Sequence, residues 1–180
     1  MEVKSQKSKV KSYTKGFTLV EMIIYIAFFA MLSLLAVEAT LVVMKSFHTL
    51  RLTQSVNQSA TVALERLSRE IRNAYDFDAT QSTFDTSPGR LTLKTKDALG
   101  VNTTMEFYVS AGNQLGLKEG GVDKGALVTK SVTVTNLVFR AITMTNSKAI
   151  KIEATLQDSR AATTQTVKFY DTIVLRGSVH

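Results

Sequence analysis

The chain has 180 residues, enough for one modest domain or for one domain with an appendage. It carries 22 Lys and Arg against 15 Asp and Glu, but residues 1–16 hold five lysines and one acid, so +4 of the net +7 lies at the N-terminus. This uneven charge argues against a uniformly basic nucleic-acid binder. The absence of Cys excludes disulfides, thiolate metal sites and a cysteine nucleophile, and a hydrophobic content of 44% excludes disorder throughout.

Residues 17–44 form an apolar stretch that predicts a membrane-spanning helix. Only five of its 28 residues are polar, and they do not recur at the spacing of a soluble amphipathic helix. The charge-free part, Met22–Val37, would be about 24 Å long as a helix, and its apolar flanks bring it to the hydrocarbon thickness of about 30 Å. Lysines before the stretch and sparser charge after it predict a cytoplasmic N-terminus and an extracytoplasmic remainder.

A secretory signal peptide is the alternative interpretation of the same stretch. Cleavage of such a peptide requires an A-x-A-like site after the apolar region, and no A-x-A occurs from Phe17 to Met44. The apolar region also exceeds the usual length of about 7–15 residues. We therefore expect the helix to be retained.

Glu21 is the unusual residue of the apolar stretch, because no Lys or Arg follows it closely. A carboxylate inside a bilayer costs about 2.5–3.5 kcal/mol on insertion scales and usually has a specific partner. A cut between Gly16 and Phe17 would create such a partner, the α-amine of Phe17. One helix cannot fold its own N-terminus back over four residues without breaking backbone hydrogen bonds, so the amine of a neighbouring subunit fits better.

The sequence KGFTLVE, Lys15–Glu21, resembles the prepilin cleavage and methylation motif of type IV pilins and type II secretion pseudopilins. The resemblance implies that a membrane prepilin peptidase removes residues 1–16, cutting between Gly16 and Phe17, and methylates the new amine of Phe17. It also implies that Glu21 docks to the N-terminus of a neighbouring subunit during filament assembly. The expected partners are the prepilin peptidase, other pilin or pseudopilin subunits, an inner-membrane assembly platform and membrane lipid.

Within this family the chain is most similar to the minor pseudopilins of the J type. The similarity rests on ALERLSREIRNA (Ala63–Ala74), on NLVFRAI and on a final strand that ends in TIVLRG. Two features of many major subunits are missing, a helix-kinking proline and a pair of cysteines near the C-terminus. Both absences favour a minor or pseudopilin role.

The helix is expected to continue well beyond the membrane. No Gly or Pro occurs from Phe17 to Ser87, and after Lys45 the apolar residues recur every three or four positions. The predicted buried stripe consists of Val56, Ala60, Ala63, Leu64, Leu67, Ile71 and Ala74. The i,i+4 pairs Glu65–Arg69 and Arg66–Glu70 are expected on the solvated side, and the helix is expected to end near Tyr75–Phe77.

From Arg90 onward the sequence has the alternation of β-strands. The predicted strands are 90–96, 104–110, 132–145, 149–157 and 165–177, and the predicted turns are 97–100, 112–113, 120–121, 146–147 and 158–160. No βαβ rhythm occurs, so we expect an α+β fold of pilin-like lollipop type, with the long N-terminal helix packed on an antiparallel β-sheet head. The predicted organisation is a basic leader (1–16), a transmembrane or filament-core helix (17–44), its amphipathic continuation (45–77) and a β-rich head (78–180).

The sequence contains no recognisable set of catalytic residues. The two histidines, His48 and His180, form no zinc-binding or triad motif, and the glycines of residues 120–125 lack the Lys-Ser/Thr of a phosphate loop. Asp123, Asp158 and Asp171 could supply a calcium site but match no calcium-loop spacing, so scattered acids are the better interpretation. Arg66, Arg69 and Arg72 alternate with glutamates, which indicates a solvated helix face rather than a nucleic-acid contact. We expect no enzyme activity, no cofactor and no metal.

The sequence therefore predicts a prepilin-like structural subunit of the inner membrane. It would assemble as a minor pilin or pseudopilin into a type II secretion pseudopilus or a type IV pilus-like filament. The alternative is an uncleaved single-pass membrane protein whose extracytoplasmic head binds a ligand. An envelope-anchored enzyme is a third class, but no catalytic motif in the sequence supports it.

Overall fold

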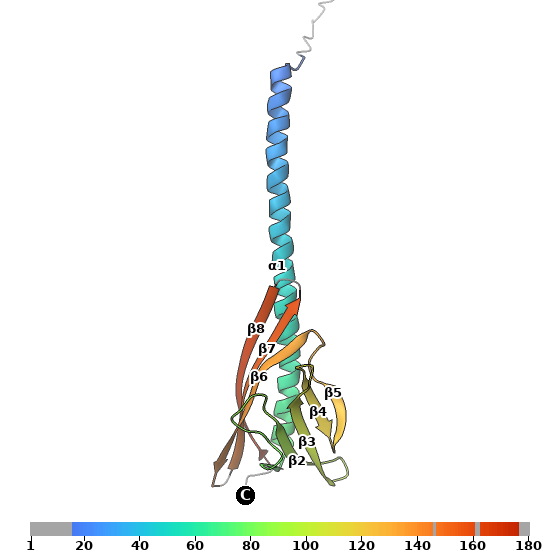
Figure 1. The fold of residues 1–180 in the computed structure, drawn as a ribbon, viewed down its shortest axis with the longest axis vertical. Coiled ribbons are helices and arrows are strands. Elements are labelled where there is room, and N and C mark those ends of the chain that lie inside the picture. The colour runs from blue at the N-terminus through green and yellow to red at the C-terminus, as the bar shows by residue number, and fades with distance from the viewer. Residues whose placement is uncertain (1–15, 146, 161–162, 177–180) are drawn as a thin grey trace, which may run out of the picture. The chain divides into compact units, whose positions relative to one another are not determined.

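The structure is a computed structural model that describes residues 16–145, 147–160 and 163–176. Apart from Gly16, the expected leader lies outside these residues. The chain divides into two compact units, one ending at Lys45 and one beginning at Ser46. A single helix, α1 (Leu19–Asn73), has its first part in one unit and its second part in the other (Figure 1).

The first part of α1 has the properties of a membrane span. Its most apolar 18-residue window has none of its residues buried, and it is long and apolar enough to cross a bilayer. Large apolar side chains are exposed all around it, among them Ile26, Phe29 and Leu34. Such a surface requires a nonaqueous environment, so α1 is a candidate membrane helix.

The second unit contains two antiparallel sheets, which together with α1 confirm the expected α+β fold. The strands of the first sheet pair in chain order; they are β1 (Asp76–Phe77), β2 (Leu91–Lys96), β3 (Asn102–Val109), β4 (Leu115–Glu119) and β5 (Val122–Ala126). The second sheet has the order β6-β7-β8; its strands are β6 (Val132–Met144), β7 (Ser147–Arg160) and β8 (Thr163–Val174). The head thus holds two sheets where the sequence predicted one.

Most predicted turns are confirmed by backbone geometry. Gly100 (φ +80°) closes the β2–β3 turn, and its N–H donates to the Asp97 carbonyl over 3.0 Å. Gly120 (φ +56°) and Gly121 (φ +82°) form the β4–β5 turn, where only glycine adopts two consecutive positive φ values easily. The predicted turn at 158–160 is wrong, because β7 continues to Arg160. Asn146, in another predicted turn, lies outside the described residues.

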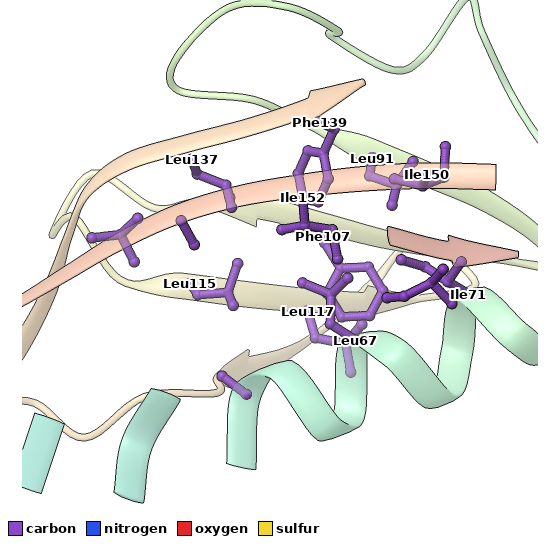
Figure 2. Close-up of a cluster of buried hydrophobic side chains, with 14 of the residues drawn as sticks. Leu67, Ile71, Leu91, Phe107, Leu115, Leu117, Leu137, Phe139, Ile150 and Ile152 are labelled. Atoms are coloured by element: carbon purple, nitrogen blue, oxygen red, sulfur yellow. The ribbon is translucent and has the colours of Figure 1, made fainter. Parts of the chain in front are cut away.

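One hydrophobic core joins α1 to both sheets. Leu67 and Ile71 point from α1 toward Phe107 and Leu117 of the first sheet (Figure 2). The second sheet contributes side chains to the same cluster, Leu137, Phe139, Ile150 and Ile152. All of these residues are almost fully buried, so α1 and the two sheets share one dry interior.

The predicted helix stripe is confirmed, with a different burial at four residues. Leu64 is only half-buried, while Leu52 and Ser59 are buried as well. Glu70, expected on the solvated side, is only 7% exposed and pairs with Arg66, whose Nε lies 2.9 Å from Glu70 Oε1. The methylenes of Glu70 can cover the core while its carboxylate is neutralised at the rim. The helix ends at Asn73, shortly before the expected end.

The outer edge of β6 is covered by the chain itself. The N–H groups of Asp85 and Gly89 donate to the carbonyls of Phe139 (2.9 Å) and Leu137 (2.8 Å), and the Ser87 hydroxyl accepts from the Leu137 N–H (3.2 Å). A Cβ on Gly89 would lie 2.9 Å from the Leu137 carbonyl oxygen, so only glycine allows this approach.

Leu67→Ala should lower the free energy of unfolding by about 2–5 kcal/mol, because it removes a side chain with no exposed surface and leaves a cavity. The measurement is the midpoint of denaturant unfolding of the detergent-solubilised protein. Val62→Ala is the control, because Val62 lies on the same helix but is 55% exposed. Equal losses for both variants would contradict the assigned core face.

Candidate functional site

The site residues predicted from the sequence, Gly16, Phe17 and Glu21, lie at the start of α1. Thr18 caps the helix, because its hydroxyl accepts from the Glu21 N–H (3.3 Å) and its carbonyl from the Met22 N–H (3.2 Å). Thr18 and Glu21 have the spacing of a capping box, in which a hydroxyl satisfies an N–H that the first turn leaves free. The cap therefore fixes Glu21 in the first turn.

Phe17, Glu21 and Tyr25 lie on one face, at intervals of four residues. The Tyr25 hydroxyl donates to Glu21 Oε1 over 3.2 Å, and the rings of Phe17 and Tyr25 meet edge to face with centroids 6.1 Å apart. Within the described residues no Lys, Arg or His forms an ion pair with Glu21. One neutral hydroxyl leaves the negative charge of the carboxylate unbalanced.

Gly16 and Phe17 are both exposed, and Phe17 is 70% so. A Cβ built on Gly16 would meet no atom within 4 Å, and the backbone there lies outside the positive-φ region. Nothing in the described chain therefore requires glycine at position 16. A preference for glycine at this position would have to come from a molecule that acts on it.

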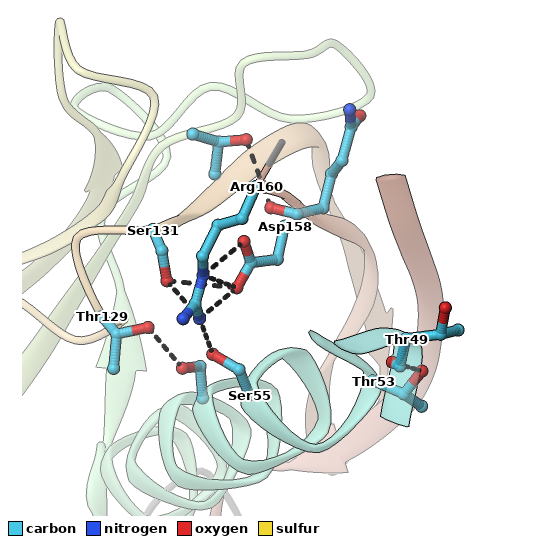
Figure 3. Close-up of polar contacts among 10 residues, drawn as sticks. Thr49, Thr53, Ser55, Thr129, Ser131, Asp158 and Arg160 are labelled. Carbon is cyan, nitrogen blue, oxygen red and sulfur yellow. Dashed lines mark hydrogen bonds and ion pairs between the residues drawn. The ribbon is translucent and has the colours of Figure 1, made fainter. Parts of the chain in front are cut away.

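A second polar site, which the sequence analysis missed, joins α1 to β7 (Figure 3). Arg160 Nη2 donates to Asp158 Oδ2 (2.7 Å), to the Ser55 hydroxyl of α1 (2.8 Å) and to the Ser131 hydroxyl (3.0 Å). The Ser131 hydroxyl in turn donates to Asp158 Oδ2 (3.1 Å). The carboxylate of Asp158 is fully buried. Its hydrogen bonds with Arg160 and Ser131, and the bond from Arg160 to Ser55, hold α1 against β7.

The environment of Asp158 lowers the pKa of its carboxyl group. Burial by itself raises that pKa, but the hydrogen bonds from Arg160, Ser131 and Ser55 and the charge of Arg160 lower it by more. The ion pair also raises the pKa of Arg160, since the Asp158 carboxylate stabilises the charged guanidinium. Both groups are therefore charged in the folded protein.

The other two acids considered above as calcium ligands do not lie together with Asp158. Asp123 in β5 accepts hydrogen bonds from the Gly125 N–H and the Tyr108 hydroxyl, both at 2.8 Å, which lower the pKa of its carboxyl group. Asp171 in β8 accepts a hydrogen bond from the Thr172 N–H over 2.8 Å. Asp158 lies in β7 opposite Gln165, which is six residues before Asp171. Among the described residues, no three His, Cys, Asp or Glu side chains gather as a metal site would require.

The remaining candidates lie on the surface of α1. His48 is exposed, and His180 lies outside the described residues. Arg69 pairs with Glu65 (3.1 Å), as the sequence predicted. Arg72 is exposed in the last turn, where a cation stabilises the negative end of the helix dipole.

Asp158→Asn should flatten the dependence of stability on pH. The native pKa of Asp158 lies below its unfolded value of about 3.9, so its contribution is complete above that pH and is lost as the pH falls through the native pKa. The variant should lose about 1–3 kcal/mol at pH 7 and show a smaller decrease on acidification. Denaturant unfolding at pH 7, 4 and 2.5 measures this, with Asp171→Asn, on the exposed part of β8, as the control at pH 7. An unchanged acid transition in Asp158→Asn would contradict the assignment.

Comparisons of this chain with models of protein families, with curated proteins and with solved structures find no match. Its function has to be inferred from its own residues.

Proposed function

We propose that this chain is a prepilin-like structural subunit, cleaved after Gly16 and N-methylated at Phe17. The mature subunit assembles as a minor pilin or pseudopilin into a type II secretion pseudopilus or a type IV pilus-like filament. Its work is associative rather than catalytic. The apolar helices bundle in the fibre, and the heads pack on its outside.

One observation carries the proposal: a carboxylate that has no cationic partner among the described residues stands in the first turn of an exposed apolar helix. Glu21 receives one hydrogen bond, from Tyr25, and no ion pair within the described residues. Hydrolysis of the peptide bond between Gly16 and Phe17 produces a carboxylate on Gly16 and an amine on Phe17. That amine lies about one helical turn from Glu21 along the axis, so the amine of a neighbour shifted by that distance can neutralise the carboxylate.

The amine that pairs with Glu21 comes from a neighbouring subunit. Phe17 precedes the Thr18 cap, and reaching Glu21 of the same helix would require the first turn to open and lose the hydrogen bonds to Thr18. A neighbour shifted along the helix axis has no such constraint. Because the large apolar side chains of the span are all exposed, adjacent helices can pack on any side.

Cleavage also changes how the subunit is held. Residues 1–16 carry four net positive charges, which favour the cytoplasmic face of the membrane. Their removal leaves Phe17 as the first residue of the chain. The same reaction therefore releases the N-terminus from the membrane surface and creates the cation that assembly uses.

Expression with an active prepilin peptidase should yield a chain that starts at Phe17 and is heavier by one methyl group. Intact mass with N-terminal fragmentation of the membrane-extracted protein measures both changes. Gly16→Leu should leave the chain starting at Met1, because a side chain at this position would obstruct the peptidase, although the described chain itself has room for it.

Other N-termini decide between the alternatives. A wild-type chain that still starts at Met1, with a control substrate cleaved, would overturn the proposal and favour an uncleaved single-pass protein. A start beyond Met44 would indicate an ordinary signal peptide. A normal mature mass for Gly16→Leu would refute the cleavage position.

Glu21→Ala should leave cleavage largely intact but reduce incorporation into filaments, because it removes the group that pairs with the neighbouring amine. The measurement compares the fraction of processed subunit that is recovered in sheared or cross-linked filaments. Glu38→Ala is the matched control, since it removes a carboxylate from the same helix about 26 Å further along its axis. Wild-type incorporation of Glu21→Ala would refute the pairing.

A further inference from the structure

Three of the four edge strands in the two sheets are protected against pairing with another chain. β1 has two residues, and the edge of β6 is hydrogen-bonded to residues 85–89. β5 carries Asp123, Lys124 and Gly125, and its pairing with β4 contains a register shift. Short length, charge, irregularity and coverage are the usual devices that keep a sheet edge from extending.

β8 has almost none of these devices. It pairs with β7 without interruption from Thr163 to Val174, contains no Gly or Pro, and has only two charged residues, Lys168 and Asp171, of opposite sign. In Figure 1 it forms the outer edge of its sheet. A strand of 12 residues with this composition is a template for another strand.

The direction of the backbone groups of β8 follows from one hydrogen bond. The N–H of Leu175 donates to the Lys148 carbonyl (2.9 Å), so odd-numbered residues of β8 face β7 and even-numbered residues face away. Thr166, Lys168 and Tyr170 therefore present N–H and C=O groups outward, and no described residue pairs with these groups. The outward N–H of Thr172 is the exception, because it donates to Asp171 Oδ1.

The two faces of β8 indicate what an added strand would carry. Val167 and Phe169 are half-buried against the core, so their free sides would be covered by apolar residues of a neighbouring strand. On the opposite face Tyr170 is 66% exposed, and Lys168 has no carboxylate partner among the described residues. A complementary strand would place an acidic residue near Lys168.

We propose that the edge of β8 binds an amphipathic β-strand of a different protein chain, which extends the β6-β7-β8 sheet. The strand contributes apolar side chains beside Val167 and Phe169 and an acidic side chain beside Lys168. This proposal goes beyond the filament function and does not depend on cleavage at Gly16.

A second copy of the chain is a poor occupant. Arg160 contacts Ser55 and Lys148 contacts Asp76 (2.6 Å), so β8 starts near Ser55, ends near the end of α1 and runs in the direction of α1. Antiparallel pairing of two β8 strands requires a two-fold axis perpendicular to the sheet. That axis reverses residues 46–73 of α1 in the second copy, which does not suit two chains that enter one membrane from the same side.

The probe is an acetylated and amidated peptide with the sequence of residues 148–159, KAIKIEATLQDS, which β8 already accepts on its other edge. In the same register its Glu153 lies opposite Tyr170 and diagonal to Lys168. Added to the full-length protein in nanodiscs, it should slow hydrogen exchange at the amides of Thr166, Lys168 and Tyr170 by about tenfold or more at saturation. The amide of Phe169, which already faces β7, is the internal reference.

Two pairs of variants and one modified peptide separate strand pairing from other binding. Thr166→Pro removes an outward N–H without removing a bond to β7 and should weaken peptide binding about tenfold or more, whereas Thr166→Ala keeps that N–H and should bind normally. The peptide that is N-methylated at its residues Glu153 and Thr155 should not bind. In the proposed pairing, those two peptide amides face β8. Lys168→Glu should weaken binding, and Lys168→Arg should retain it.

Three outcomes would overturn the proposal. They are no exchange protection at millimolar peptide, equal binding by the N-methylated peptide or by a folded Thr166→Pro variant, and a β8-mediated dimer of the chain itself that Thr166→Pro dissociates. Loss of filament incorporation with normal peptide binding would instead count against the proposed function alone.

Discussion

The apolar stripe on the second half of α1 is the contact on which the head depends. Neither sheet can bury its inner face without it, and Leu67 and Ile71 belong to the same buried cluster as residues from both sheets. A helix that is apolar on one side ends up against a sheet, and a helix that is apolar on all sides needs lipid or other helices. Both conditions occur along α1, and they change near the boundary of the two units at Lys45 and Ser46.

Periodicity predicted much of this architecture. The absence of Gly and Pro from residue 17 to 87 predicted one long helix, and alternation predicted the strands that became β2, β3, β6, β7 and β8. β4 and β5 were missed because Gly116, Gly125 and several charges lower their strand propensity. Their pairing with β3 and with each other decides their structure, and Gly116 leaves room for the Tyr108 ring, which a Cβ would approach to 2.7 Å.

The two candidate sites also differ in how far they could be predicted from the sequence. Gly16, Phe17 and Glu21 could be selected from sequence because they lie within six residues and contrast with an apolar background. The Asp158–Arg160 cluster could not, since Arg160 finds Ser55 across 105 residues and Ser131 across 29. Two charges near a predicted turn look like solvated loop residues until the fold buries one of them. The unprotected edge of β8 is likewise visible only once the strand order is known.

The Thr18 cap has a consequence for the mature chain that the proposed cleavage would produce. Thr18 accepts the hydrogen bonds described at the start of α1, so removing residues 1–16 would take none of these bonds from the helix. The new ammonium group, however, would stand beside the positive end of its own helix dipole, which disfavours a cation there by about 0.3–1 kcal/mol. In the proposed mature subunit this repulsion would slightly destabilise the free N-terminus, and contact with a neighbour's carboxylate would relieve it. In the proposed subunit, formation of the helix and readiness to polymerise would therefore be separate properties of the same few residues.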